Sequence, residues 1–298
     1  MAGKGSASKS AAARQAAADL RAKQRAAARR MTILFTVGAL ALVGLFVAAI
    51  VFIVKTGEEE GPYAVPNSGE FKAPSVVEED GAILIGPGGV IGEAPPEGAI
   101  AVELVEDPLC PWCRIFDEVA SAEVEYLIDQ GEIAFRYHIV SILDDYSAGT
   151  HYSTRMANAW ATAAEYDPDH FWAFVKLSFA RQPDEGVKGL TNGEIADVAR
   201  DAGVSEDAID RFADGEFTRW VAQTTERDTQ TYWYVDPTTG QEGFGTPTVR
   251  IGGVHFGYWT TPGNITAGVT YVRENGAEAF EDYLLNPPEV SPSPSASA

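Results

Sequence analysis

Two segments in the middle of the chain carry the residue pattern of β-strands, and a helical pattern lies between them. Residues 99–106 (AIAVELVE) and 132–142 (EIAFRYHIVSI) are rich in β-branched and aromatic residues and predict two strands. Helical spacing runs from Pro111 to about Gln130. A shorter strand followed by a Gly/Pro turn is predicted within residues 81–92. The order strand, strand, helix, strand indicates an α/β domain.

A block of helices is predicted next, from Tyr152 to about Tyr234, and we place its limits at about residues 148–235. Its large apolar side chains recur at helical spacing, which favours a role in the core. Thr191 and Glu194 have the spacing of a capping box, in which both side chains bond to free amides at a helix start. The block therefore reads as an insertion of helices between two strands.

Strand character returns at residues 246–251, with Gly252-Gly253 as a tight turn into a second strand at 254–258. A last helical stretch is predicted over 261–285, with a break at Gly276. Strands separated by helices predict a central sheet that is covered by helices.

Residues 31–54 are 24 consecutive residues without a charge. Roughly 20 apolar residues span a bilayer, and a signal peptide has a much shorter apolar run, so we expect a transmembrane helix. Eight Lys and Arg residues precede it, and only Lys55 follows closely. The positive-inside rule then places residues 1–30 in the cytoplasm as a basic tail and the rest outside, as a single-pass protein of the cell membrane.

Composition divides the outward part further. Residues 55–78 are rich in Glu, Gly and Pro and predict a solvated linker, and the Pro/Ser-rich residues 287–298 predict a disordered tail. The folded domain is therefore expected at 79–286. Residues 56–298 hold 13 basic and 42 acidic residues, and the whole chain has a net charge of -21. Such an acidic body repels phosphate backbones, which argues against nucleic-acid binding.

The chain has two cysteines, Cys110 and Cys113, which are too close together to staple a fold. Such a pair in an oxidising compartment favours redox chemistry. Pro111 suits the first position of a helix, which would place Cys110 at the cap, exposed and activated as a thiolate by the helix N-terminus. Cys113 would lie one turn on, within reach of a mixed disulfide formed at Cys110. Zinc binding needs about four ligands, and the four histidines show no ligand spacing; an inert disulfide remains the alternative.

The segment Asp107–Cys113 (DPLCPWC) resembles the active site of DsbA-like thioredoxin-fold proteins, especially membrane-anchored ones of actinobacteria. The segment Phe244–Val249 (FGTPTV), followed by the Gly-Gly turn, resembles the second signature of that family, in which a cis-proline faces the cysteine pair. The resemblance extends over residues 80–286 and includes the helical insertion. It implies an α/β thioredoxin fold with an inserted helical domain, here preceded by one transmembrane helix.

The resemblance also implies roles for single residues. Cys110 is expected to be the nucleophile and Cys113 the resolving thiol. Pro247 is expected to be the cis-proline, and the backbone of Thr246 to bond to an extended client. A redox-active disulfide between Cys110 and Cys113 is then the only redox group required, with no cofactor and no metal.

Other residues near the motif support or qualify this prediction. The strongest oxidants of the family have His where this chain has Trp112, which cannot donate charge to a thiolate and instead offers apolar surface to clients. Glu103 and Asp107 are candidates for exchanging a proton with the resolving thiol. Solvent exposure is the alternative for Glu103, and shaping of the turn with Pro108 is the alternative for Asp107. His138, within a strand, reads as a core residue.

The resulting hypothesis is an extracytoplasmic dithiol oxidase that introduces disulfides into exported cysteine-containing proteins. The resemblance implies reoxidation by a quinone-linked membrane enzyme of the DsbB or vitamin K epoxide reductase kind. A thiol reductase on the same fold is the first alternative, because relative potentials set the direction of exchange. A chaperone-like module that binds clients and has a structural disulfide is the second.

Overall fold

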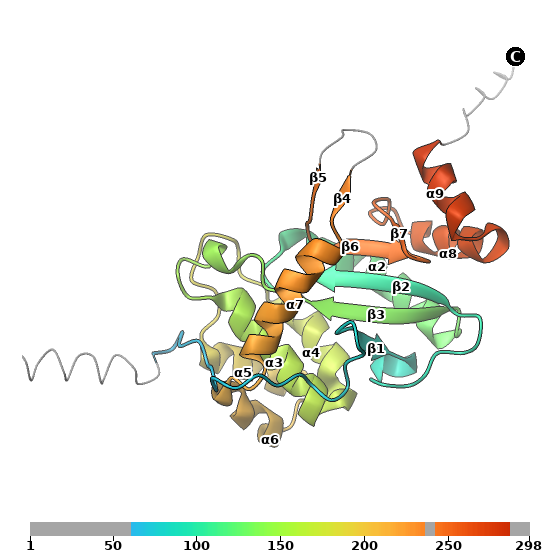
Figure 1. Ribbon diagram of the computed structural model, residues 1–298. Coiled ribbons are helices and arrows are strands. Elements are labelled where there is room, and N and C mark those ends of the chain that lie inside the picture. Colours follow the sequence, from blue (N-terminus) through green and yellow to red (C-terminus); the bar gives the residue numbers. More distant parts are fainter. Residues whose placement is uncertain (1–60, 236–241, 287–298) are drawn as a thin grey trace, which may run out of the picture. The chain divides into compact units, whose positions relative to one another are not determined.

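A mixed five-stranded sheet lies at the centre of the computed structural model, which describes residues 61–235 and 242–286. Strands β2 and β3 are parallel, and every other neighbouring pair in this sheet is antiparallel (Figure 1). The strands lie in the order β1 (Ile83–Ile85), β3 (Ile133–Ile139), β2 (Ile100–Glu106), β6 (Thr248–Ile251) and β7 (Val254–His255). The predicted strands are thus present, with β3, β6 and β7 shorter than expected.

The register of β2 and β3 decides which side chains share a face of the sheet. Leu104 pairs with Tyr137 and Glu103 with Arg136. Because side chains alternate along a strand, Leu104 and Glu106 lie on one face and Glu103 on the other. Leu104 and Tyr137 belong to the main hydrophobic core, whereas Val105 on the other face belongs to a smaller cluster. The face that carries Glu106 is therefore the core face.

Helices cover both faces of the sheet. The helix α2 (Pro111–Asp129) packs with α8 (Asn264–Asn275) on the core face, and α7 (Thr218–Thr231) crosses the opposite face (Figure 1). Gly276 separates α8 from α9 (Ala277–Leu285), which confirms the predicted break. The short 3₁₀ helix η1 (Pro87–Gly89) forms the predicted turn after β1.

The predicted helical block is an insertion between β3 and the second half of the sheet. Most of its aromatic side chains are buried as expected, and the capping box of Thr191 and Glu194 is formed by both side chains. Besides α7, the insertion contains two 3₁₀ turns and four helices: η2 (Asp144–Tyr146), α3 (Tyr152–Tyr166), α4 (Pro168–Ala180), α5 (Asn192–Asp201), α6 (Glu206–Ile209) and η3 (Asp210–Asp214).

The end of the helical block differs from the prediction. Helix α7 stops at Thr231, and β4 (Tyr234–Val235) pairs with β5 (Glu242–Gly243) in a separate two-stranded sheet. Tyr and Val favour strands, and the Tyr234 ring stacks on His255 at 4.0 Å between ring centroids. This contact with the edge strand β7 overrides the helical pattern.

The described part of the predicted linker, residues 61–78, is mostly exposed, but parts of its backbone bond to the helical insertion. The backbone amide of Asn192 donates to Pro62 O at 2.7 Å, and the Thr218 hydroxyl donates to Pro66 O at 2.6 Å. Composition alone suggests solvation here, but the insertion supplies donors for these backbone carbonyls. The folded domain therefore begins by Pro62.

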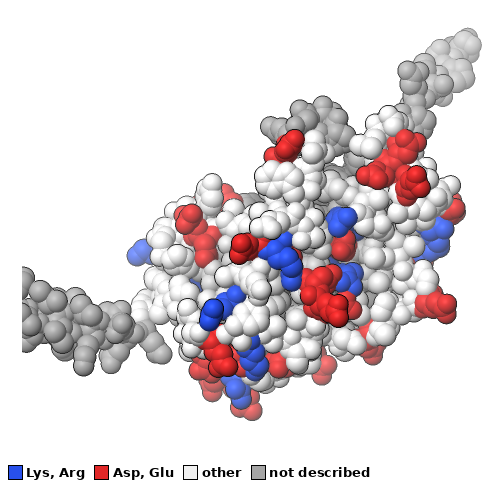
Figure 2. Space-filling view, viewed as in Figure 1, with Lys and Arg blue, Asp and Glu red and all other residues white. Residues whose placement is uncertain are grey.

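Membrane insertion can be addressed only for the described residues. Within 61–235 and 242–286, no helix is both long and apolar enough to cross a bilayer. The predicted span 31–54 and the basic tail lie outside the described residues, as does the tail at 287–298. On the face of the molecule in Figure 2, acidic and basic side chains are interspersed, so this face presents no extended basic surface.

Candidate active site

The two thiols lie at the junction of β2 and α2. Cys110 is the N-cap residue of α2, with extended backbone (φ −69°, ψ 118°), and Pro111 occupies the first helical position. Cys113 follows within the first turn, and its amide donates to Cys110 O at 3.1 Å. Both cysteines are present as free thiols. The cap position predicted for Cys110 is confirmed.

The predicted exposure of Cys110 is wrong. Cys110 is 4% exposed and Cys113 is 0% exposed, whereas Trp112 between them is 57% exposed. Cys110 is covered because the loop at Thr246-Pro247 lies against it, with Cys110 Sγ donating to Thr246 O at 3.0 Å. The motif therefore presents an indole to solvent and keeps both sulfurs beneath the surface.

The Thr246-Pro247 peptide bond is cis, as predicted. It joins the loop after β5 to β6, and the contact between Thr246 O and Cys110 brings this loop to the thiol pair across 136 residues of sequence. A backbone carbonyl beside the reactive sulfur is a hydrogen-bond acceptor that an extended client could use.

The two thiols have opposite acidities. The pKa of Cys110 is lowered from 9.0 because the Cys113 thiol donates a hydrogen bond to its sulfur. Burial opposes this shift, and Thr246 and the amides of Trp112 and Cys113 add to it. Burial raises the pKa of Cys113 well above 9.0, and its hydrogen bond to Cys110 raises it further. Cys110 is therefore the thiol prepared to ionise, and Cys113 the one that keeps its proton.

Glu106, which sequence reasoning missed, is the acid next to the thiols. It is 1% exposed, and burial raises the pKa of Glu106 well above its ordinary value of 4.5. The Tyr137 hydroxyl and the Cys113 thiol beside it lower that pKa in part. Glu106 in turn raises the pKa of Cys113, so the protonation state of each of these two groups affects the other. The signal available in the sequence was the even spacing from Leu104, which puts Glu106 on the same face as Leu104.

Glu103, the predicted candidate, lies on the opposite face of β2. Its Oε1 accepts a hydrogen bond from the Tyr232 hydroxyl at 3.1 Å, and its Oε2 lies 3.4 Å from Arg250 Nη1. Strand alternation thus separates Glu103 from Cys113 by the thickness of the sheet. The assignment of Glu103 as a supporting residue of the thiol site is wrong for this physical reason.

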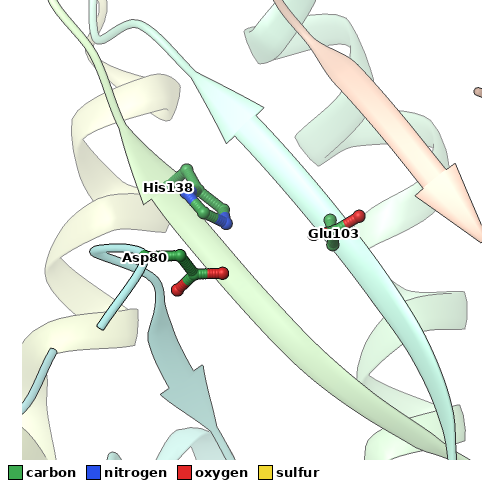
Figure 3. Close-up of side chains that lie close together, drawn as sticks. All are labelled: Asp80, Glu103 and His138. Atoms are coloured by element: carbon green, nitrogen blue, oxygen red, sulfur yellow. The ribbon is translucent and has the colours of Figure 1, made fainter. Parts of the chain in front are cut away.

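Glu103 instead belongs to a polar group with Asp80 and His138 (Figure 3). The ligand-type atoms of the three side chains lie within 4.8 Å of one another. Each already has a protein partner: Arg136 pairs with Asp80, Arg250 with Glu103, and the Tyr232 hydroxyl lies 2.9 Å from His138 Nε2. The group is therefore a network of ion pairs and hydrogen bonds that ties α7 to the sheet, and buried His138 belongs to the core as predicted.

Asp107 shapes the turn that leads into the motif. Its Oδ1 accepts from the Leu109 amide at 2.7 Å and from the Ser153 hydroxyl at 2.8 Å, and its Oδ2 accepts from the Leu143 amide at 2.9 Å. Burial raises the pKa of Asp107 to about 7, although these three donors lower it. The alternative of a turn-forming role is confirmed, and through Ser153 that role includes the helical insertion.

Aromatic rings surround the exposed side of the motif. The Trp112 ring meets the edge of Trp259 at 6.5 Å between centroids, and Trp259 contacts Phe116 at 5.4 Å. This arrangement holds the Trp112 indole at the surface, next to the covered thiols. It supplies the apolar surface that the sequence suggested.

A dithiol at a helix start, facing a cis-proline loop on a mixed sheet with a helical insertion, defines the class of DsbA-like thioredoxin-fold proteins. A family model described as Thioredoxin matches residues 90–267, and the chain belongs to this family. The predicted fold class is confirmed for the described residues.

Two curated proteins are similar to part of this chain. The serine/threonine-protein kinase PknE of Mycobacterium tuberculosis is 29% identical over 118 residues, which cover 38% of this chain and 21% of PknE. Disulfide bond formation protein D of Bacillus subtilis is 26% identical over 95 residues, which cover 32% of this chain and 40% of that protein. The chain thus spans about a fifth of the length of PknE and about two fifths of the length of disulfide bond formation protein D.

Among solved structures, DsbA of Mycobacterium tuberculosis is 26% identical and matches with TM-scores of 0.52 (oxidised) and 0.51 (reduced). Each match covers 67% of this chain and 97% of DsbA. The predicted resemblance to DsbA-like proteins, including actinobacterial ones, is therefore confirmed. Together with the paired thiols, it supports a disulfide oxidoreductase.

Proposed function

We propose that this chain is a membrane-anchored, extracytoplasmic thiol–disulfide oxidoreductase that acts as a dithiol oxidase on exported proteins. The observation that carries the proposal is the placement of two thiols at one helix start, with Cys110 at the N-cap beside Thr246 O and Cys113 buried one turn on. The lowered pKa of Cys110 and the raised pKa of Cys113 agree with this division of roles. A thiol of low pKa is a good leaving group, and stabilising the reduced form as a thiolate makes the disulfide more oxidising. A site that stabilises this thiolate supports donation of a disulfide, and the reduction potential distinguishes an oxidase from a reductase.

The exchange begins with a Cys110–Cys113 disulfide. A client thiolate attacks Cys110 Sγ, the Cys110–Cys113 bond breaks, and Cys113 leaves and takes up a proton. A second client thiolate attacks the client sulfur of the mixed disulfide, and Cys110 leaves as a thiolate. The client loses two electrons as its disulfide forms, and the protein gains both electrons as its dithiol.

The dithiol must then pass its two electrons to an oxidant before it can act again. We assign this step to a quinone-linked membrane enzyme of the DsbB or vitamin K epoxide reductase kind. The uncharged residues 31–54 support a location in the same membrane, and the basic residues before them support an extracytoplasmic thiol domain.

A groove of about 690 Å³ next to the thiols offers a place for a client chain. It runs from Pro247 and Trp259, beside Cys110 and Trp112, to Leu285 at the end of α9. Trp233 and Tyr258 line it and are 55% and 54% exposed. Exposed aromatic side chains in a groove that reaches the active-site loop at Pro247 fit the apolar side chains of an unfolded segment.

Replacing Trp233 and Tyr258 together by serine is expected to weaken oxidation of a reduced, unfolded protein by about tenfold in kcat/KM. The loss reflects apolar contact with the client, for which tenfold corresponds to about 1.4 kcal/mol. Oxidation of a small dithiol should be unchanged, because it is too small to occupy the groove. Tyr126→Ser, at an equally exposed tyrosine on α2 outside the groove, is the matched control. Equal losses with both substrates would show that the groove does not bind clients.

The reduction potential of the full chain in detergent tests the direction of exchange. We expect a value less negative than about −200 mV, on the side of DsbA at about −120 mV. Because this chain has Trp112 where the strong oxidants have His, its reduction potential should be more negative than that of DsbA. Equilibration with glutathione buffers measures it. A value near the roughly −270 mV of thioredoxin would assign the chain to the reductase alternative instead.

A further inference from the structure

Gln182 follows α4 in the helical insertion, and its side chain reaches the segment that carries the nucleophile. Its Nε2 donates to Pro108 O at 2.8 Å and to Cys110 O at 3.0 Å. The side chain is buried, and 72 residues separate Gln182 from Cys110 along the chain. An amide nitrogen has two hydrogens. This one group therefore uses both of them on the two carbonyls that bracket Leu109.

The Cys110 carbonyl is also the acceptor with which α2 begins. It accepts from the amides of Cys113 at 3.1 Å and of Arg114 at 3.3 Å. The carbonyl and the sulfur of Cys110 are set by the same backbone conformation, φ −69° and ψ 118°. Holding the carbonyl therefore holds the backbone from which the Cβ–Sγ bond departs, and this limits the positions that the sulfur can take. In this conformation Sγ faces Thr246 O and the first amides of the helix.

We propose that Gln182 is a positioning residue for the nucleophile, because it holds the Cys110 carbonyl in the N-cap geometry that aims the sulfur at the helix start. The inference rests on the proposed thiol–disulfide exchange and names a residue of the insertion that controls its reactive thiol. The insertion thus acts on the chemistry through its hydrogen bonds to the active-site turn.

Asp107 holds the same turn from its other side, through Leu109 and Ser153. Its carboxyl carries a charge that depends on pH, so a substitution there would change charge and geometry together. Gln182 is neutral at every pH. Its replacement therefore tests geometry alone.

Gln182→Met keeps the side-chain length and removes both donors. The Cys110 carbonyl then keeps only its bonds from the amides of Cys113 and Arg114, and the turn from Pro108 to Cys110 is no longer tied to the insertion. The sulfur therefore loses part of its alignment with the helix amides. The pKa of Cys110 should rise towards the free value of about 8.5. Because the reduced form is less stabilised, the equilibrium constant with glutathione should shift tenfold towards the oxidised protein, or about 30 mV more negative. Gln182→Glu, which as a carboxylate can only accept, should shift it further in the same direction.

The experiment uses the full chain in detergent and three readouts. They are the pH dependence of Cys110 alkylation, the equilibrium with glutathione, and the melting temperatures of the oxidised and reduced forms. Gln130→Met, at an exposed glutamine capping the other end of α2, is the matched control and should leave all three unchanged. If Gln182→Met lowers both melting temperatures equally and leaves the alkylation midpoint and the equilibrium at their wild-type values, Gln182 is merely structural and the proposal is overturned.

Gln182→Asn provides the second test if Gln182→Met does not fold. Its amide keeps two hydrogens but reaches about 1.5 Å less far, so it cannot serve both carbonyls. The alkylation midpoint should again rise, and an unchanged midpoint would overturn the proposal. None of the three readouts needs a client protein. A wild-type chain that exchanges disulfides with no client would therefore refute the proposed function without deciding the role of Gln182.

Discussion

Cys110→Ser is expected to abolish disulfide exchange, whereas Cys113→Ser is expected to accumulate mixed disulfides between Cys110 and client cysteines. The Cys110 sulfur has a lowered pKa at the helix start and lies beside Thr246 O. Cys113 is fully buried with a raised pKa, so it neither ionises readily nor meets a client. Serine has no sulfur with which to form a disulfide. Loss of Cys110 therefore removes the reaction. Loss of Cys113 prevents the Cys110–Cys113 disulfide from forming, so a mixed disulfide made at Cys110 is not resolved within the protein and persists.

Non-reducing electrophoresis of cells that express each variant, followed by mass spectrometry of the trapped species, measures this difference. The double variant Cys110→Ser/Cys113→Ser gives the background of non-covalent association. Both single variants keep the apolar surface around Trp112, so a chaperone-like module would capture clients equally well with either. Mixed disulfides on Cys113 in the Cys110→Ser variant would reverse the roles assigned here.

The parts of the site that follow from local sequence could be predicted. Pro111 directly after Cys110 marks a helix start, and the cap position follows from the missing N–H of proline. The cis bond at Thr246-Pro247 depended on the family resemblance, since such bonds are rare among X–Pro bonds in general. In both cases a short motif determines the backbone conformation. The prediction needed no knowledge of which residues meet across the fold.

The parts that depend on residues distant in sequence could not be predicted. Burial of Cys110 is caused by a loop 136 residues away, and Gln182 reaches Cys110 across 72 residues. The choice between Glu103 and Glu106 was open to prediction in principle, because alternation from Leu104 places them on opposite faces. What the pattern alone did not give was which of the two faces α2 would cover. That is decided by the packing of the whole sheet.

Glu106→Gln is expected to stabilise the protein at neutral pH while slowing the step in which Cys113 resolves a mixed disulfide. The stability effect follows from the raised pKa of Glu106. The folded protein keeps this proton over a pH range in which the unfolded chain has lost it, so stability falls as pH rises from about 4.5 towards the raised pKa. One such group changes the free energy of unfolding by at most about 1.4 kcal/mol per pH unit. Glutamine has no proton to lose, so the variant should lack this part of the pH dependence.

The kinetic effect follows from the place of Glu106 beside Cys113. When Cys113 attacks the mixed disulfide on Cys110, its thiol must lose a proton, and its raised pKa makes that loss unfavourable without a base. The ionised form of Glu106 can take the proton, and removing a positioned base slows proton transfer by on the order of 100-fold. The release of glutathione from a Cys110–glutathione mixed disulfide, followed by stopped flow, measures this step alone. The initial attack of Cys110 on glutathione disulfide should keep its wild-type rate.

Glu103→Gln is the matched control, because it makes the same substitution on the same strand but on the opposite face of the sheet. It should leave the release of glutathione unchanged, and its effect on stability should come only from the bonds to Tyr232 and Arg250. The raised pKa values of Asp107 (about 7) and Asp117 (about 6) act on stability with the same sign as Glu106 and are present in both variants. The comparison between the two variants therefore isolates Glu106. Equal slowing of the release step in both would mean that the proton of Cys113 leaves by another route.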